Sequence, residues 1–220
     1  LDNPVVLEKS IKGHQHYVEE ISPDFVKIMS DGFFRYPSAL YSREITSIQE
    51  LKDIQPIGEH HPWIEQQIKV VKEIRSHFHE EIASFYNIFS PISYLKRWFR
   101  TDQSRGDQVI AAFLKEDPET LAHVLDVIAG DIAILSRRLI QEAGVEGIYF
   151  STQQVQDERV TEEEYRKFIE PSSIAVLEAA NEAGGINILH ICGFEGASNE
   201  VELFKDYPAQ VINWATHHEG

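Results

Sequence analysis

The sequence predicts an α/β protein with a parallel sheet, of the kind that forms an incomplete eight-stranded barrel. Short apolar segments with β character alternate along the chain with amphipathic helical segments, which is typical of parallel α/β domains. The chain has 220 residues and stops just after a strand-like segment, whereas a closed barrel of eight strand–helix units typically needs about 250. We therefore expect one domain, residues 1–220, that forms part of a TIM-type (β/α)8 barrel and is a fragment of a longer chain.

Five apolar segments predict the strands of this sheet. They are rich in β-branched and aromatic residues, and most are bounded by Gly, Pro, Ser or Asp, which interrupt regular structure. The predicted strands are 25–30, 82–89, 145–150, 186–193 and 210–214.

The clearest helix spans 118–143, where apolar residues recur every three or four positions. Asp117 is a natural N-cap, Pro118 suits the first helical position, and Gly144 supplies the C-terminal stop. Two further caps are visible, because Ser47 with Glu50 and Thr161 with Glu164 have the spacing of a capping box. The other predicted helices are 5–21, 62–79, 92–99, 106–114, 161–183 with a kink or restart at Pro171, and short helices after Ser47 and Asn199.

The composition argues against several classes of function. The net charge is -16, from 36 acidic and 20 basic residues, which disfavours binding to nucleic acid or to anionic membranes. No apolar run approaches the length of about 18 residues that a membrane-spanning helix needs, and the first residues do not resemble a signal peptide. A single cysteine excludes an internal disulfide and favours a reducing compartment, so we expect a cytoplasmic protein.

The segment 186–193 carries the strongest chemical signal. Side chains alternate along a strand, so His190 and Cys192 are expected to point to the same side, at the C-terminal end where parallel α/β proteins place their chemistry. An imidazole and a thiolate at this spacing could supply two ligands of a zinc site. The alternative is simple packing, because lone cysteines are often buried in cores.

Other polar residues follow predicted strands. Asp31 comes directly after 25–30, although Asp-Gly is also a common turn signal. Residues 151–154 follow the strand at 145–150 and are either pocket-lining or an ordinary loop. The one local excess of positive charge, which is either an anion-binding site or a solvated helix end, comprises Lys96, Arg97, Arg100 and Arg105.

Six stretches occur in a characteristic order and spacing: DFVKIMSDG at 24–32, FSP at 89–91, EAGVEGI at 142–148, YRKFIEP at 165–171, LHICG at 189–193 and VINW at 211–214. Together they resemble the uroporphyrinogen decarboxylase family. That family includes the decarboxylase of haem biosynthesis and zinc-dependent methyltransferases that act on corrinoid or thiol acceptors. The resemblance implies a (β/α)8 barrel with its site at the C-terminal ends of the strands.

The resemblance also implies roles for individual residues. In decarboxylases, the Asp of a Ser-Asp pair orients the pyrrole nitrogens and a later Ser contacts the substrate, which match Asp31 and Ser151. In the methyltransferases, the His-x-Cys-Gly motif supplies two zinc ligands, which match His190 and Cys192, with a second Cys that this chain lacks.

The chain departs from the family pattern at three further places. The arginine-bearing N-terminal segment of the decarboxylases has no counterpart here. The site tyrosine is not matched in register, because Tyr94 is close but Arg97 falls nearer the expected position. The Asp-Trp pair that often closes the sixth strand reads Asn213-Trp214 here. We take Tyr94, Arg97 and Asn213 as candidate substrate-binding residues.

Three functions follow from the resemblance. The first is zinc-dependent methyl transfer to a corrinoid or thiol, with His190 and Cys192 as ligands and a third ligand from Asp31 or from beyond this chain. The second is cofactor-free decarboxylation of uroporphyrinogen, a tetrapyrrole, with Asp31 stabilising a protonated pyrrole. The third is binding of a corrinoid or another small ligand without turnover. In each case the partner is a small molecule, and a homodimer is among the expected assembly states.

Overall fold

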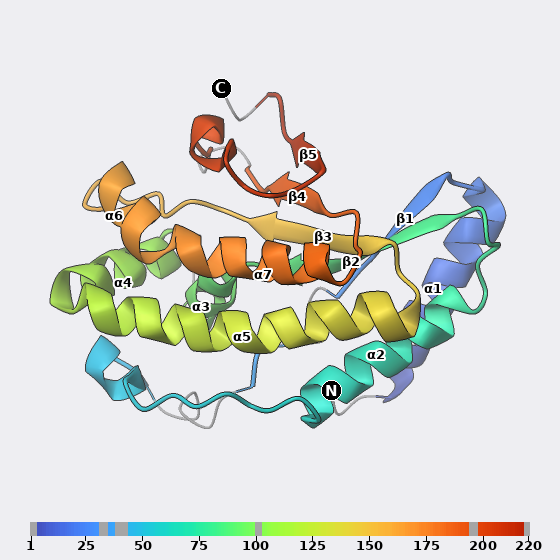
Figure 1. The fold of residues 1–220 in the computed structure, drawn as a ribbon, viewed down its shortest axis with the longest axis horizontal. Coiled ribbons are helices and arrows are strands. Elements are labelled where there is room, and N and C mark those ends of the chain that lie inside the picture. The colour runs from blue at the N-terminus through green and yellow to red at the C-terminus, as the bar shows by residue number, and fades with distance from the viewer. Residues whose placement is uncertain (1–3, 31–34, 38–43, 100–102, 194–197, 218–220) are drawn as a thin grey trace.

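The computed structural model describes residues 4–30, 35–37, 44–99, 103–193 and 198–217. Its centre is one sheet of five strands that follow one another in sequence order and are all parallel (Figure 1). The sheet curls, with helices on its outer side, and this is the architecture of an incomplete TIM-type barrel, as the sequence predicted. The strands are β1 (Phe25–Ile28), β2 (Ala83–Phe89), β3 (Gly147–Thr152), β4 (Ile188–Ile191) and β5 (Val211–Trp214).

Helices occupy the connections between the strands. Two of them, α5 (Pro118–Ala143) and α7 (Glu170–Glu182), run side by side over the outer side of the sheet (Figure 1). Within the described ranges, no helix is long and apolar enough to cross a membrane. The helical elements are α1 (Pro4–Ile21), η2 (Ile48–Leu51), α2 (Pro62–Arg75), α3 (Pro91–Phe99), α4 (Gln103–Glu116), α5 (Pro118–Ala143), α6 (Glu162–Phe168), α7 (Glu170–Glu182) and η3 (Val201–Phe204).

Helix α5 has the bounds that the sequence predicted, because both of its ends are set by local chemistry. The Asp117 carboxylate accepts a hydrogen bond from the backbone N–H of Thr120, and Gly144 adopts a φ of 72°, a conformation that favours glycine. The apolar stripe of α5 packs against α2, α3 and α7. The helix therefore links the two halves of the outer layer.

The helix predicted at 161–183 is divided into α6 and α7 at Ile169. Pro171 lies in the first turn of α7, and a proline there has no N–H to continue the hydrogen-bond ladder of α6. The capping box of Thr161 and Glu164 is formed, as predicted. Helix α2 ends at Arg75, earlier than expected.

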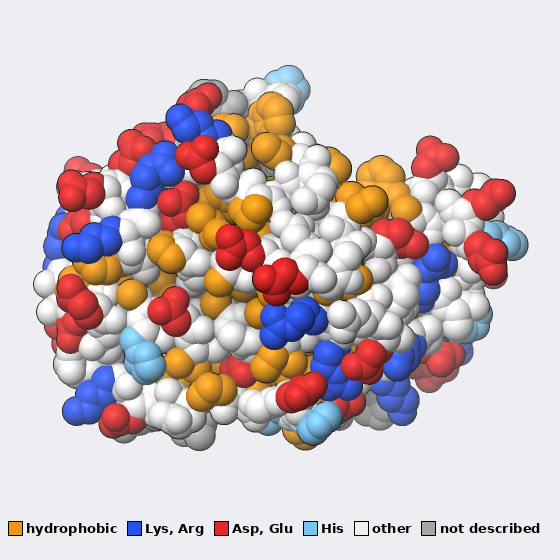
Figure 2. All heavy atoms as spheres, viewed as in Figure 1, with side chains coloured by type: hydrophobic (Ala, Val, Ile, Leu, Met, Phe, Trp, Pro, Cys, Tyr) orange, Lys and Arg blue, Asp and Glu red, His pale blue; other side chains and the backbone are white. Residues whose placement is uncertain are grey.

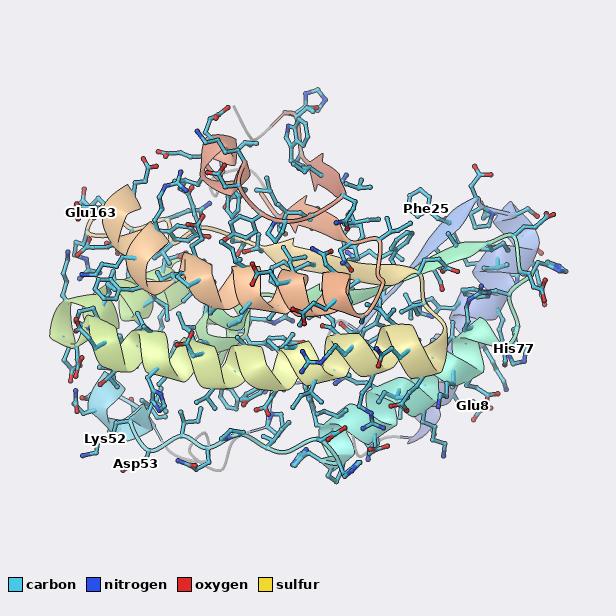
Figure 3. All side chains as sticks on the ribbon, viewed as in Figure 1. Glu8, Phe25, Lys52, Asp53, His77 and Glu163 are labelled. Carbon is cyan, nitrogen blue, oxygen red and sulfur yellow. The ribbon has the colours of Figure 1, made fainter. Side chains whose placement is uncertain are left out.

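Burial differs between the edges and the centre of the sheet. Both edge strands are partly open, with Phe25 of β1 55% exposed and Val211 and Ile212 of β5 45% and 41% exposed, and Figure 3 shows Phe25 on the side of β1 away from α2. In β1 to β4, side chains that point toward the helices are almost fully buried, among them Val26, Ile28, Ile88, Phe150 and Leu189.

We expect the α5 interface to dominate the stability of this scaffold. Leu125 is fully buried on α5, so Leu125→Ala should lower the free energy of unfolding by about 2–5 kcal/mol through lost burial and a residual cavity. His123 lies on the exposed side of the same helix, and His123→Ala should change it by no more than about 0.5 kcal/mol. Urea denaturation measures both. Equal effects of the two substitutions would contradict this packing.

Candidate functional site

The parallel register aligns three of the predicted site residues. Ser151 of β3 is the Cα partner of His190 in β4, and His190 is the Cα partner of Asn213 in β5. Partners in a parallel pair lie on the same face of a sheet. The three residues therefore form one row on the inner face, near the C-terminal ends of their strands.

The imidazole of His190 is held in a defined orientation. Its Nδ1 lies 2.6 Å from the Oδ1 of Asn213, and the hydroxyl of Tyr149 donates to the same oxygen at 2.7 Å. The rings of Tyr149 and His190 pack together, with their centroids 5.2 Å apart. Because an amide oxygen only accepts hydrogen bonds, this contact requires a proton on Nδ1, and in the neutral ring the lone pair is then on Nε2. This is the tautomer that binds a metal through Nε2.

Cys192 lies two residues after His190, and both its backbone N–H and its backbone carbonyl form hydrogen bonds. Its N–H donates to the carbonyl of Thr152 at 2.9 Å, which extends the ladder between β3 and β4. Its carbonyl accepts from the side chains of Gln153 at 2.7 Å and Asn199 at 3.3 Å. The side chain of Gln153 therefore helps to hold the backbone of Cys192 in place.

The hydroxyl of Tyr149 is influenced by its surroundings. Burial raises the pKa of the Tyr149 hydroxyl, and the negative charge of a Cys192 thiolate raises this pKa further. The phenol therefore stays protonated at neutral pH and keeps its donor role toward Asn213. The sequence analysis did not select Tyr149, although it lies two positions before Ser151 and so shares its face.

The described residues provide part of a metal site. His190 and Cys192 are of the types that zinc prefers, and His190 lies on the inner face of β4, with Cys192 two residues later, just past the end of the strand. No group of three or more His, Cys, Asp or Glu side chains close enough to hold a metal occurs in the part of the chain that the structure describes. Asp31, the predicted catalytic residue and candidate third ligand, lies outside the described residues.

Ser151 belongs to a second, buried network. Its hydroxyl donates to the Oδ1 of Asn87 in β2 at 2.8 Å, and the hydroxyl of Ser30 donates to the Asn87 carbonyl at 2.6 Å. Ser30 directly precedes Asp31 in the sequence. The ends of β1, β2 and β3 are therefore tied together through one asparagine, which the sequence analysis did not single out.

Tyr94 and Arg97 occupy different environments on α3. Tyr94 is buried in an aromatic cluster with Tyr36, Trp63 and Phe89, at centroid distances of 5.7–6.3 Å. Arg97 is exposed, and its guanidinium carbon lies 4.4 Å from the centroid of the Phe89 ring. Phe89 is the Cα partner of Ser151, so Arg97 lies near the row of site residues, whereas Tyr94 packs among rings.

The basic cluster is not uniformly solvated. Lys96 is buried, and its ammonium lies 2.5 Å from the Asp107 carboxylate and 3.2 Å from the carbonyl of Gln154. Asp107 also accepts from the backbone N–H of Gln156 at 3.2 Å. This ion pair therefore connects α3 and α4 to the segment that follows β3. Gln153 of the same segment donates a hydrogen bond to the carbonyl of Cys192. Arg105 is exposed, and Arg100 lies outside the described residues.

A hollow of about 620 Å3 lies elsewhere, between α1 and α2. Glu8 and His77, labelled in Figure 3, are among the residues that line it. It is formed by helices and contains none of the predicted site residues.

The Lys96–Asp107 pair yields a stability prediction. Lys96→Met leaves the buried Asp107 carboxylate without its ion-pair partner and should lower the free energy of unfolding by about 3–5 kcal/mol. The double variant Lys96→Met/Asp107→Leu removes both charges and should recover most of that loss. Urea denaturation of the two variants checks this. If Lys96→Met were as stable as the unmodified chain, the ion pair would not stabilise the segment that follows β3.

Comparisons with known proteins agree with the fold. The family model described as uroporphyrinogen decarboxylase (URO-D) matches residues 37–218. No curated protein sequence matches the chain. A solved structure, a methyltransferase from Methanosarcina mazei, is similar with a TM-score of 0.67 and 13% sequence identity, over 94% of this chain and 62% of that chain. This chain thus spans less than two thirds of that protein's length, and at this identity the likeness shows the fold. The chain belongs to the uroporphyrinogen decarboxylase family.

Proposed function

We propose that this chain carries the zinc-binding part of a methyltransferase that acts on a thiol or corrinoid. The observation that carries the proposal is the orientation of His190, whose Nδ1 is bonded to Asn213, while Cys192 follows β4 directly and continues its hydrogen bonds to the end of β3. A ligand histidine is commonly held through its second ring nitrogen in this way. The solved structure with a similar fold is that of a methyltransferase, which supports the same class of reaction.

The residues of the site would have separate roles. His190 Nε2 and the Cys192 thiolate would be zinc ligands, and the remaining ligands would come from outside the described residues, with Asp31 as a candidate. Bound zinc would act as a Lewis acid that lowers the pKa of a thiol substrate and so favours its nucleophilic thiolate. Asn213 would maintain the histidine tautomer, and Gln153 would hold the backbone of Cys192.

Decarboxylation of uroporphyrinogen is the second candidate. It is supported by the buried bonds that link Ser30, Asn87 and Ser151, because they order the two strand ends at which the family resemblance places substrate contacts. Such a substrate carries several carboxylates and needs cations. Arg97 is one exposed cation near this row.

Metal content separates these two candidates. The purified full-length protein should contain about one zinc per chain, and Cys192→Ser should lose it because the hydroxyl is a far weaker zinc ligand than the thiolate. His217→Ala is the control, since this exposed histidine lies beyond β5 and should leave the zinc content unchanged. Atomic emission spectroscopy measures the zinc content of the unmodified protein and of each variant. Protein that contains no zinc but consumes uroporphyrinogen would contradict methyl transfer and support decarboxylation.

The role of Asn213 is tested by metal affinity. Asn213→Ala removes the acceptor for Nδ1 and should weaken zinc binding by about 10–100-fold, the usual effect of losing such an outer-shell partner. Tyr149→Phe removes one donor but keeps the bond between Asn213 and His190, so its effect should be smaller. Thr216→Ala, in the exposed turn after β5, is the matched control. Competition with a fluorescent zinc chelator gives the affinities, and equal affinity in Asn213→Ala and Thr216→Ala would refute this role.

A further inference from the structure

Asn199 is a buried polar residue between two exposed neighbours. Its exposed fraction is 3%, whereas Ser198 and Glu200 are both open to water. The charged side chains in Figure 2 are spread over the surface, where they stay hydrated. A buried amide instead loses its hydrogen bonds to water, and this loss is costly unless protein groups replace them. The contacts of Asn199 therefore show what its burial achieves.

The side-chain amide of Asn199 connects the segments that follow two neighbouring strands. Its Oδ1 accepts a hydrogen bond from the backbone N–H of Gln154, after β3, at 2.9 Å. Its Nδ2 donates to the backbone carbonyl of Cys192, after β4, at 3.3 Å. A backbone N–H only donates and a carbonyl only accepts, so this orientation of the amide is the one that satisfies both partners.

Glutamine side chains join the same two segments nearby. The backbone N–H of Glu200 donates to the Oε1 of Gln154 at 2.8 Å. The side chain of Gln156 donates to the backbone carbonyl of Ser198. These bonds hold the two segments side by side, and the amide of Asn199 extends the connection to the cysteine.

The backbone of Cys192 is held on both sides of its Cα. Its N–H donates to the carbonyl of Thr152 at 2.9 Å. Its carbonyl accepts from Gln153 at 2.7 Å and from Asn199 at 3.3 Å, and two donors on one oxygen define the direction of that carbonyl. Because peptide groups are planar, fixing both of them fixes φ and ψ, and with them the direction of the Cα–Cβ bond. The sulfur is then restricted to the staggered positions about χ1.

We propose that Asn199 is a positioning residue, which fixes the direction of the Cys192 thiol by holding the carbonyl of Cys192 against the segment after β3. This rests on the proposed function for the role of Cys192 as a zinc ligand. Metal ligands must be held in a defined geometry by groups outside the metal's own shell. Asn213 does this for the ring of His190. Asn199 would do it for the backbone of the cysteine.

The Cβ carbon of Cys192 reports this direction without any metal. Its chemical shift depends on φ, ψ and χ1, and it is measured by NMR on metal-free, reduced protein labelled with 13C at cysteine Cβ. The signal is assigned by its absence in Cys192→Ser. Asn199→Ala should shift this signal or divide it, because the carbonyl loses one of its two donors. Gln156→Ala is the matched control, since it removes an amide between the same segments but keeps the bonds of Cys192, and should leave the signal unchanged.

Asn199→Asp separates the bond to Cys192 from the link between the segments. A carboxylate has nearly the same shape as the amide and keeps an acceptor for Gln154, but at neutral pH it has no donor for the Cys192 carbonyl. The carbon signal should therefore change in this variant too, which provides a second test if Asn199→Ala does not fold. Circular dichroism identifies the folded variants.

Zinc affinity tests the consequence for the metal site. Asn199→Ala should weaken zinc binding by about tenfold, the lower end of the range for the loss of an outer-shell partner. Gln156→Ala should bind zinc as the unmodified protein does. Competition with a fluorescent zinc chelator gives these affinities.

A carbon signal that is unchanged in the folded Asn199 variants would overturn the proposal. Equal changes in Asn199→Ala and Gln156→Ala would also overturn it, because they would reflect a general loosening of the two segments. So would an unchanged zinc affinity of Asn199→Ala when the unmodified protein binds zinc. If the unmodified protein binds no zinc, the proposed function fails, and the carbon signal decides whether Asn199 positions Cys192.

Discussion

The site depends on the register of the parallel strands. Ser151, His190 and Asn213 belong to three strands that are far apart in the sequence, and only the pairing of β3, β4 and β5 brings them into one row. A slip of one residue in β4 would turn His190 and Cys192 toward the helices. The buried outer positions prevent this slip, because Leu189 and Ile191 would then lose their apolar environment.

Hydrogen bonds from polar side chains at the strand ends hold the row of Ser151, His190 and Asn213 in place. Asn87 ties β1 to β3, Asn213 fixes the imidazole, and Gln153 holds the carbonyl of Cys192. The buried Lys96–Asp107 pair then connects the segment after β3 to α3 and α4. These contacts lie on the rim where a barrel of this type carries its chemistry, so the scaffold and the proposed metal site share the same supports.

The periodicity of the sequence was sufficient to predict most of the fold. The bounds of α5 and the placement of all five strands followed from apolar repeats, caps and turn residues, because these features act within a few positions of the chain. Strand alternation alone led to the prediction that His190 and Cys192 point to the same side. Family resemblance then directed attention to Ser151 and Asn213.

Other features depend on contacts between distant segments, and local patterns do not encode them. The role of Tyr149 emerges only when β3, β4 and β5 are assembled, since its hydroxyl reaches across β4 to Asn213. The sequence predicted that Lys96 belongs either to an anion-binding site or to a solvated helix end. In the structure Lys96 is buried and forms an ion pair with Asp107, which lies on another helix. Asp31, which matters for both proposed reactions, lies outside the described residues.

The central claim is that His190 and Cys192 bind a zinc ion together. X-ray absorption at the zinc edge of the purified full-length protein tests it most directly, because sulfur and imidazole scatterers are distinguishable there. The account predicts a sulfur ligand at about 2.3 Å and imidazole nitrogen at about 2.0–2.1 Å, with the sulfur contribution lost in Cys192→Ser. A zinc shell of oxygen and nitrogen alone, unchanged in that variant, would contradict the account.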